Sequence, residues 1–321
     1  MRSAGHSGRP RSSRARCGAA ERDGIFAGAG ALLDRLPAGP RVLYAVALAL
    51  VAFVTAILNL DTSVFFLTPV LLHLARLRSL DEGPFLYGAV FMSNAGSLFL
   101  PGSNLTNLLV LDGARMSSSM LHAWLASCAL TATFVVVAFR PQVRAPEAGT
   151  PRPFHIGVGV VAVAVAAVLV VGLREPALPV LAVGLCAAAV RREIPRVGVP
   201  ALAALLAFTV CLGTLARSWH APAALLASSG SWTTAATSAV ASIALNNLPA
   251  AVLFSAQPPA HPTALLVGLD LGPNLAVTGS LSAFLWLRAA RAVGADASVA
   301  TYSRLGVLLV PLTIVGALGA S

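Results

Sequence analysis

The sequence predicts an all-α integral membrane protein, and two properties of its composition lead to that fold class. Of the 321 residues, 57% are hydrophobic and 11% are charged, and the mean hydropathy is +0.82. Soluble domains carry about 25% charged residues, so a soluble fold is excluded. The apolar residues also form runs as long as a bilayer-crossing helix, about 20 residues.

Charge and short motifs exclude several other classes. All 22 residues counted as Lys or Arg are arginines, and they lie between apolar runs, so the net charge of +10 does not indicate nucleic-acid binding. The four cysteines are far apart and have neither disulfide-framework nor zinc-ligand spacing. No Walker loop, dinucleotide fingerprint or His-Glu-x-x-His motif occurs. We therefore expect no enzymatic activity, no catalytic residue, no metal site and no cofactor.

Three regions differ in composition. Residues 1–23 are rich in Arg, Gly and Ser without lasting apolar periodicity, which predicts a disordered basic tail. Residues 24–41 are expected to form an amphipathic segment on the membrane surface. Residues 42–321 form one membrane transport domain, with a first half over 42–152 and a second half over 153–321.

Apolar runs separated by short charged connections fill the membrane domain. The predicted segments are 42–58 with 62–75, 85–111, 120–139, 154–173, 176–190, 198–216, 233–257, 263–287 and 303–320. Polar pairs, Leu60-Asp61 and Asn246-Asn247, interrupt the segments 42–75 and 233–257. We predict that each of these two segments enters and leaves the membrane on the same face.

The arginines test this topology. With the N-terminus in the cytoplasm, all but three of the 22 arginines face inward, and only Arg115, Arg174 and Arg217 face outward. This bias is the one that the positive-inside rule describes. The sequence therefore predicts a multi-pass protein of the cell inner membrane, surrounded by lipid, with its basic N-terminus in the cytoplasm.

Polar residues interrupt the apolar segments at corresponding places in the two halves. Gly, Pro and Asn break 85–111 and 263–287, and backbone freed at that depth must be buried in protein or line a wet cavity. Matching breaks in two halves of opposite orientation indicate a transporter's binding site. The candidate solute-binding residues are Asn59, Thr62, Asn94, Ser97, Ser103, Asn104, Asn246, Asn247, Asn274, Thr278 and Ser280.

Two acids complete the candidate site. Of twelve Asp and Glu residues, only Asp61 and Asp270 lie well within apolar segments. A carboxylate at that depth is costly unless it is paired, hydrated or protonated, which suits a carrier that loads and releases protons. The alternative is that both acids cap the N-termini of half-helices, where Asp is favoured.

The interrupted segments resemble those of the arsenite permease (arsenical pump membrane protein) family, within the ion transporter superfamily that also holds divalent-anion and dicarboxylate carriers. The resemblance runs from Gly24 to the C-terminus, apparently without the family's first scaffold helices. It is carried, in family order, by Asp61 ahead of Leu67-Thr68-Pro69, Ser97-Leu98 with Ser103-Asn104-Leu105-Thr106-Asn107, Asn246-Asn247-Leu248-Pro249, and Asp270-Leu271-Gly272-Pro273 through Thr278-Gly279-Ser280-Leu281 to Leu285-Trp286-Leu287.

The resemblance implies an inverted-repeat ion transporter fold with two re-entrant hairpins and two broken helices. It also implies export of arsenite or antimonite in exchange for protons, with a proton or sodium gradient in place of any cofactor. Asp61 and Thr62 would lie at the first hairpin tip, and Asn246 and Asn247 at the second. The chain departs from the family where Asn94 replaces a usual acid, Leu60 a usual amide and Asn274 a usual basic residue.

These departures leave other functions open. One alternative is a carrier of another anion, such as a dicarboxylate, sulfate or silicate. Another is a truncated remnant that no longer transports. A homodimer and an attached soluble ATPase subunit also remain open at this stage.

Overall fold

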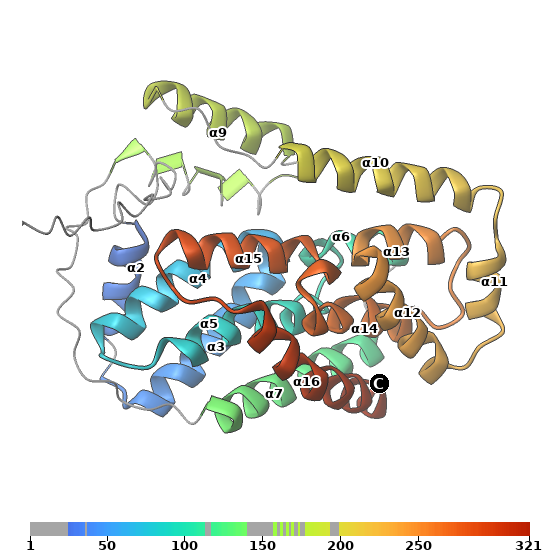
Figure 1. Ribbon diagram of the computed structural model, residues 1–321, viewed down its shortest axis with the longest axis horizontal. Coiled ribbons are helices and arrows are strands. Elements are labelled where there is room, and N and C mark those ends of the chain that lie inside the picture. Colours follow the sequence, from blue (N-terminus) through green and yellow to red (C-terminus); the bar gives the residue numbers. More distant parts are fainter. Residues whose placement is uncertain are drawn as a thin grey trace, which may run out of the picture.

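The computed structural model describes residues 25–35, 37–112, 117–139, 177–192 and 199–321, with isolated positions between 157 and 173 (Figure 1). Every regular element among the described residues is a helix, which confirms the predicted all-α class. Four described helices are long and apolar enough to cross a membrane: Pro40–Ile57, Leu60–Leu77, Ser118–Phe139 and Val299–Ala320. The predicted tail over 1–23 and most of the predicted segment 154–173 lie outside the described residues.

The first repeat begins with a helical hairpin. Helix α3 (Pro40–Ile57) and helix α4 (Leu60–Leu77) are separated only by Leu58 and Asn59. The Asn59 side chain ends this turn by accepting a hydrogen bond from the Thr62 amide at 2.8 Å. Ahead of the hairpin, helix α2 (Ile25–Asp34) packs against α4, so a helix does form within the segment that was expected to be amphipathic.

A broken helix follows the first hairpin. Helix α5 (Glu82–Gly96) ends inside the bundle, and the 3-10 turn η1 (Pro101–Ser103) and the short helix α6 (Leu105–Leu111) continue it. Pro101 cannot donate a backbone hydrogen bond, and Asn104 adopts an extended backbone at φ −149° before it caps α6. The long helix α7 (Ser118–Phe139) completes the repeat.

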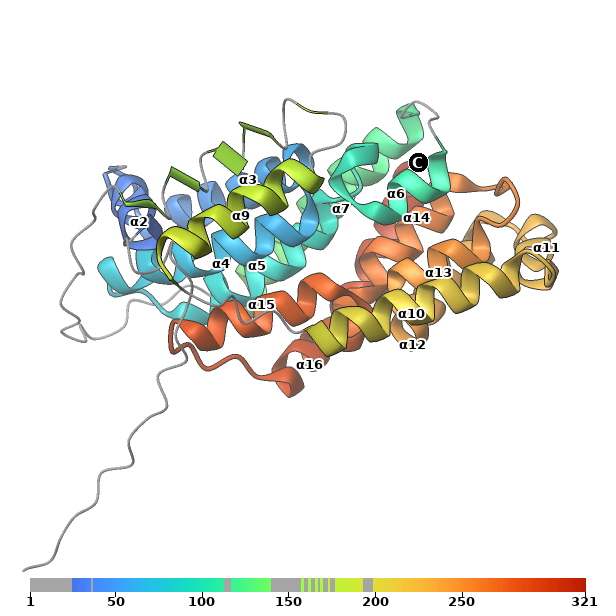
Figure 2. The same ribbon diagram turned by 90° about the horizontal axis from the view of Figure 1, so that it is seen from above.

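The second repeat uses the same order of elements. Its hairpin is α12 (Ser231–Leu245) and α13 (Asn247–Phe254), and its broken helix runs through α14 (Pro262–Leu271), η2 (Gly272–Leu275), η3 (Val277–Gly279) and α15 (Leu281–Ala292) to the long helix α16 (Val299–Ala320). Between the repeats come α9 (Ala177–Val190), α10 (Val199–Ala216) and α11 (Ala221–Ala227). Helices α9 and α10 run along the upper side of the bundle in Figure 1, which is the side that faces the viewer in Figure 2.

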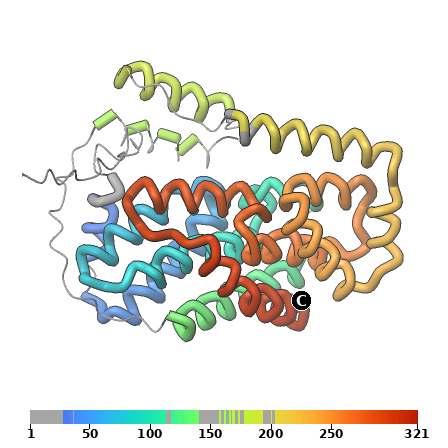
Figure 3. Tube along the Cα trace, in the orientation of Figure 1, coloured from blue at the N-terminus to red at the C-terminus, as the bar shows by residue number. Residues whose placement is uncertain are grey.

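The two repeats exchange their contacts. The first arm of each hairpin packs on the first half of its own broken helix, α3 on α5 and α12 on α14. The second arm of each packs on the second half of the other repeat's broken helix, α4 on α15 and α13 on α6 (Figure 3). The long helices α7 and α16 pack on each other. This recurrence confirms two duplicated hairpin and broken-helix units, and it places both breaks in the middle of the bundle.

Connections far apart in the chain meet at each end of the bundle. At one end, Arg76 pairs with Glu82 at 2.7 Å and donates to the Val293 carbonyl at 2.8 Å, which joins the α4–α5 and α15–α16 connections. At the other end, the hydroxyls of Ser119 and Thr263 lie 3.1 Å apart. Both pairs agree with the predicted topology, in which the members of each pair share one side of the membrane.

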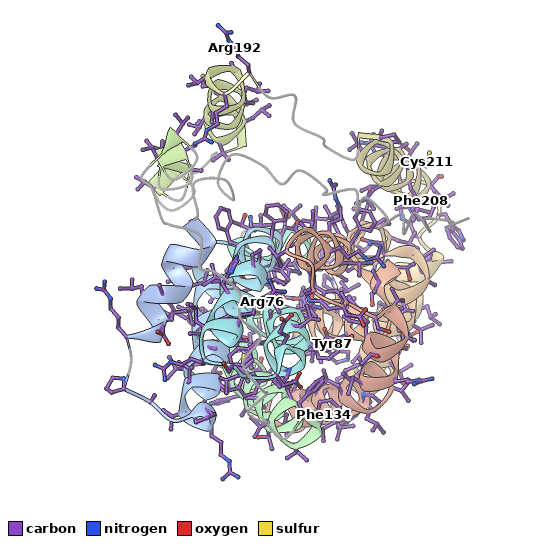
Figure 4. All side chains as sticks on the ribbon, turned by 60° about the vertical axis from the view of Figure 1, so that its left-hand side comes forward. Arg76, Tyr87, Phe134, Arg192, Phe208 and Cys211 are labelled. Atoms are coloured by element: carbon purple, nitrogen blue, oxygen red, sulfur yellow. The ribbon has the colours of Figure 1, made fainter. Side chains whose placement is uncertain are left out.

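Close packing inside the bundle depends on aromatic side chains. Figure 4 shows Tyr87 within the bundle, whereas Arg192 projects away from it beyond α9. The Tyr87 ring lies 5.5 Å from the ring of Trp286, which in turn lies 5.4 Å from that of Tyr302. Edge and tilted contacts at these separations add to the burial of apolar area. The cluster ties α5 to α15 and α16.

Tyr302→Phe tests the link between α16 and the second break. The buried Tyr302 hydroxyl donates to the Pro273 carbonyl at 2.8 Å. Its removal leaves that carbonyl with only the 3.3 Å hydrogen bond from the Ala276 amide, and we expect a loss of about 0.5–1.5 kcal/mol in stability. Thermal unfolding of the purified protein in detergent measures the loss. An unchanged unfolding temperature would show that this bond does not hold the break.

Candidate functional site

A pair of amides joins the two broken helices. Asn94, near the end of α5, donates from Nδ2 to Oδ1 of Asn274 in η2 at 2.6 Å. Both side chains are fully buried. The remaining amide atoms, Oδ1 of Asn94 and Nδ2 of Asn274, have no hydrogen-bond partner among the described residues. The pair therefore retains one acceptor and one donor for a solute group.

Asp270 lies beside this pair, near the end of α14, and is also fully buried. Its Oδ1 accepts two hydrogen bonds from the first repeat, from Asn104 Nδ2 at 2.9 Å and Thr106 Oγ1 at 2.7 Å. Its Oδ2 has no hydrogen-bond partner among the described residues. Both donors are neutral, so no cation compensates the carboxylate through these bonds.

Three polar side chains form hydrogen bonds to the backbone of the first break. Asn107 Nδ2 donates to the carbonyls of Ser97 at 2.7 Å and Leu100 at 3.0 Å. The Ser103 hydroxyl bonds to the same two carbonyls and accepts from the Leu100 amide at 3.2 Å. The Ser97 hydroxyl donates to the Asn94 carbonyl at 2.8 Å. Ser97 and Ser103, both predicted to bind solute, thus serve the fold of the break through these bonds, and the Ser97 side chain also contacts the Asp270 carboxylate.

The second hairpin tip reaches the second break. Asn246 has a positive φ of 78° and donates from Nδ2 to the Thr278 carbonyl at 3.1 Å. The Thr278 side chain is exposed, and its hydroxyl reaches the Ile243 carbonyl at 3.5 Å. The neighbouring Asn247 is buried and begins α13. The tip of the second hairpin, with Asn246 and the neighbouring Asn247, therefore lies against the backbone of the second break at Thr278.

The helix caps test the interpretation of the two acids as N-caps. The side chains that cap the half-helices α4, α6, α13 and α15 are those of Asn59, Asn104, Asn246 and Ser280. Asp270 lies near the C-terminal end of α14. The half-buried Asp61 lies in the first turn of α4, after its cap. The alternative that both acids are N-caps is therefore wrong, and their burial needs another explanation.

The structure joins some predicted residues directly and others only through packing. Hydrogen bonds link Asn94 with Asn274, Asn104 with Asp270, and Asn246 with the Thr278 backbone. Asn59, Asp61 and Thr62 lie at the first hairpin tip, and α3 of that hairpin contacts η1. Ser280 caps α15 and shares a 2.8 Å hydrogen bond with Ser282.

Sequence reasoning missed Asn107, which holds the first break, and Thr106. Thr106 bonds to Asp270, and it lies between Asn104 and Asn107, both of which also serve the site. The available signal was its place two residues after a capping Asn, in the first turn of a half-helix that follows a break. That position directs polar side chains towards the interruption.

The chemistry of the site follows from these groups. Amide and hydroxyl groups can bind hydroxyl or carboxyl groups of a small solute, and a buried carboxyl with one unoccupied oxygen can exchange a proton. The described residues contain no group of three His, Cys, Asp or Glu side chains that could hold a metal ion. Transporters commonly place their binding sites where broken helices meet inside the membrane, as the helices do here.

Comparison with known families agrees with this site. The family model described as citrate transporter (CitMHS) matches residues 18–272, which include both hairpins, the whole first broken helix and the second as far as Gly272. No match is found among curated proteins. The match supports the predicted superfamily of ion transporters, and it supports a multi-pass transporter and not an enzyme. It does not show that the chain is an arsenite permease. The chain therefore belongs to the citrate transporter family.

Proposed function

We propose that this secondary transporter moves a small carboxylate of the citrate class, coupled to protons that bind at Asp270. One observation carries the proposal. The Asp270 carboxylate is fully buried between two broken helices, with one oxygen held by neutral donors and the other without a hydrogen-bond partner among the described residues. A buried carboxylate without a cation is costly in a membrane, and a proton removes that cost.

Backbone carbonyls around the breaks favour a proton over sodium as the coupling ion. Several carbonyls freed by the breaks already accept protein hydrogen bonds: those of Ser97 and Leu100 from Asn107, that of Pro273 from Tyr302, and that of Thr278 from Asn246. Sodium needs several oxygen ligands at once. The acceptors left unpartnered among the buried, described side chains are few, Asn94 Oδ1, Asp270 Oδ2 and two threonine hydroxyls, whereas a proton needs one.

The carboxylate class rests on the family and on the amide pair. The matching family is described as a citrate transporter. Oδ1 of Asn94 and Nδ2 of Asn274 offer one acceptor and one donor, and a protonated carboxyl group offers the complementary donor and acceptor. A carboxylic acid that reaches these two atoms can satisfy both.

Arsenite is the second candidate substrate. Neutral As(OH)₃ presents only hydroxyl groups, and the hydrogen bonds found around Asp270 and the amide pair come from amides and hydroxyls. Amides and hydroxyls suit such a solute, which would leave in exchange for protons. Other anions of the superfamily, namely dicarboxylates, sulfate and silicate, and a remnant without transport activity, are the remaining outcomes of the test.

Uptake into proteoliposomes under an imposed pH gradient separates these functions. The purified protein is tested with labelled citrate, succinate, sulfate and arsenite in parallel, with protein-free liposomes as the control. We expect accumulation of citrate that disappears when a protonophore removes the gradient. Accumulation of arsenite alone would select the second candidate, and failure to transport any of the four would contradict the proposal.

We also propose that the N-terminus and the Arg76–Glu82 end of the bundle face the cytoplasm. The support is the arginine bias together with the contact that joins this end to the Val293 carbonyl. Ser79→Cys, introduced into a variant without the native cysteines, should react with a membrane-impermeant maleimide only in inverted vesicles. Neither a dimer nor an ATPase subunit is needed for this proposal.

A further inference from the structure

Thr106 stands between two parts of the carrier site that belong to different repeats. Its hydroxyl lies 2.7 Å from Oδ1 of Asp270 in α14 and 3.5 Å from Oδ1 of Asn107 in its own helix. Asn107 in turn holds the carbonyls of Ser97 and Leu100 in the first break. A single hydroxyl proton can serve only one of the two acceptors at a time.

We propose that Thr106 is a positioning residue that fixes the Asp270 carboxyl by Oδ1, leaves Oδ2 as the oxygen that takes the proton, and passes the charge state of Asp270 to the first break. This inference rests on the proposed proton role of Asp270. It adds the residue that connects that role to the broken helix of the other repeat.

The choice of oxygen follows from the hydrogen bonds. Oδ1 already receives Asn104 Nδ2 and Thr106 Oγ1, whereas Oδ2 receives no donor from the described residues. A proton therefore adds to Oδ2, and Oδ1 becomes the carbonyl oxygen of the neutral acid. Bonds to a charged acceptor are about twice as strong as bonds to a neutral one, so protonation weakens the hold of Thr106 on Asp270.

Once its bond to Asp270 weakens, the Thr106 hydroxyl has a second acceptor within reach, Asn107 Oδ1. When the Thr106 hydroxyl turns towards Asn107 Oδ1, it bonds to the side chain that clamps the first break. Helix α6, which carries both residues, also packs on the hairpin arm α13 of the second repeat. When Asp270 becomes neutral, the hydrogen bonding within the first break therefore changes. The bonding in the first turn of α6 changes with it, and α6 contacts α13 of the second hairpin.

No described ionisable group hydrogen bonds to Asp270. The elements packed against α14 are α5, α6, α7, α12, α13 and α16. Their ionisable side chains are Glu82, Tyr87, His122, Cys128, Tyr302 and Arg304. Of these, Glu82 pairs with Arg76, and the Tyr87 and Tyr302 hydroxyls bond to backbone at Ser298 and Pro273. The neutral side chains of Thr106, Ser97 and Asn104 are therefore the direct contacts through which the charge on Asp270 is felt.

Infrared spectroscopy of the substrate-free protein in lipid tests the geometry. The C=O stretch of the protonated Asp270 carboxyl is assigned by its loss in Asp270→Asn. Thr106→Val removes one donor from Oδ1 and should move this band to higher wavenumber, whereas Thr106→Ser keeps the hydroxyl and should leave it in place. Thr313→Val is the matched control, because the buried Thr313 hydroxyl donates to the Leu309 carbonyl of its own helix at 2.8 Å.

Transport measurements test the consequence. In Thr106→Val we expect accumulation of citrate driven by a pH gradient to fall at least about tenfold, as the loss of one charge-assisted bond predicts. Counterflow exchange of citrate, which needs no net proton movement, should stay within about twofold of wild type. Thr106→Ser should restore accumulation, and Thr313→Val should leave both activities unchanged.

The role of Thr106 and the proposed function of the protein are refuted by different results. An Asp270 band that does not move in Thr106→Val, or accumulation that survives in that variant, refutes the role of Thr106 alone. Loss of both accumulation and counterflow in a folded Thr106→Val variant, or no rescue by Ser, refutes it as well. If the wild-type protein shows neither an Asp270 carboxyl band nor proton-driven transport, the proposed function itself fails.

Discussion

Asp270→Asn is expected to abolish transport driven by a pH gradient, with a reduction of at least about 100-fold, the lower range for loss of an essential proton-transfer group. Asn has nearly the same shape as Asp, and its Oδ1 can still accept the bonds from Asn104 and Thr106. It cannot take up and release a proton. The variant should therefore fold normally and lose only the coupled step.

Citrate uptake into proteoliposomes with and without a protonophore measures this effect. Asp296→Asn is the control, because Asp296 is exposed in the connection between α15 and α16. Asp61→Asn should have a smaller effect than Asp270→Asn, because Asp61 is only half-buried at the first hairpin tip. Proton-driven uptake that survives in Asp270→Asn would remove this carboxyl from the mechanism.

Gly306→Ala is expected to destabilise the protein by about 3 kcal/mol, the upper end of the usual range for overpacked sites. Gly306 lies in α16, where a methyl group would overlap the Asn274 carbonyl oxygen and approach Leu275 Cα to 2.8 Å. These are backbone atoms of η2, so they cannot turn away as a flexible side chain would. The break would have to shift, and with it the Asn94–Asn274 pair.

Gly319→Ala on the same helix is the matched control, because a methyl group there meets nothing within 4 Å. Thermal unfolding in detergent should show a clear fall for Gly306→Ala and no fall for Gly319→Ala. Citrate transport should be lost in the first variant alone. Equal stability of the two variants would show that α16 and η2 do not pack as closely as described.

Much of the fold could be predicted from the sequence because a bilayer restricts what a chain can do. Helices must satisfy their own backbone, so long apolar runs predict spans, and the described helices α7, α10 and α16 begin within five residues of the predicted starts. Pro101 and Pro273 predict breaks because Pro cannot donate a helical hydrogen bond, and the Asn and Gly residues around them have low helix propensity. Local chemistry determines these features, so they can be recognised from the sequence alone.

The partners of the polar side chains depend on the tertiary structure. Asn94 and Asn274, or Thr106 and Asp270, are more than 160 positions apart in the chain, and no local pattern says which amide meets which acid. The sequence also does not separate Ser103, whose hydroxyl is bonded to the backbone of its own break, from Asn104, which reaches across to the other repeat. Composition and local chemistry thus place polar groups at the interruptions, whereas the exchange of contacts between two folded repeats decides which of them meet around the carboxylate.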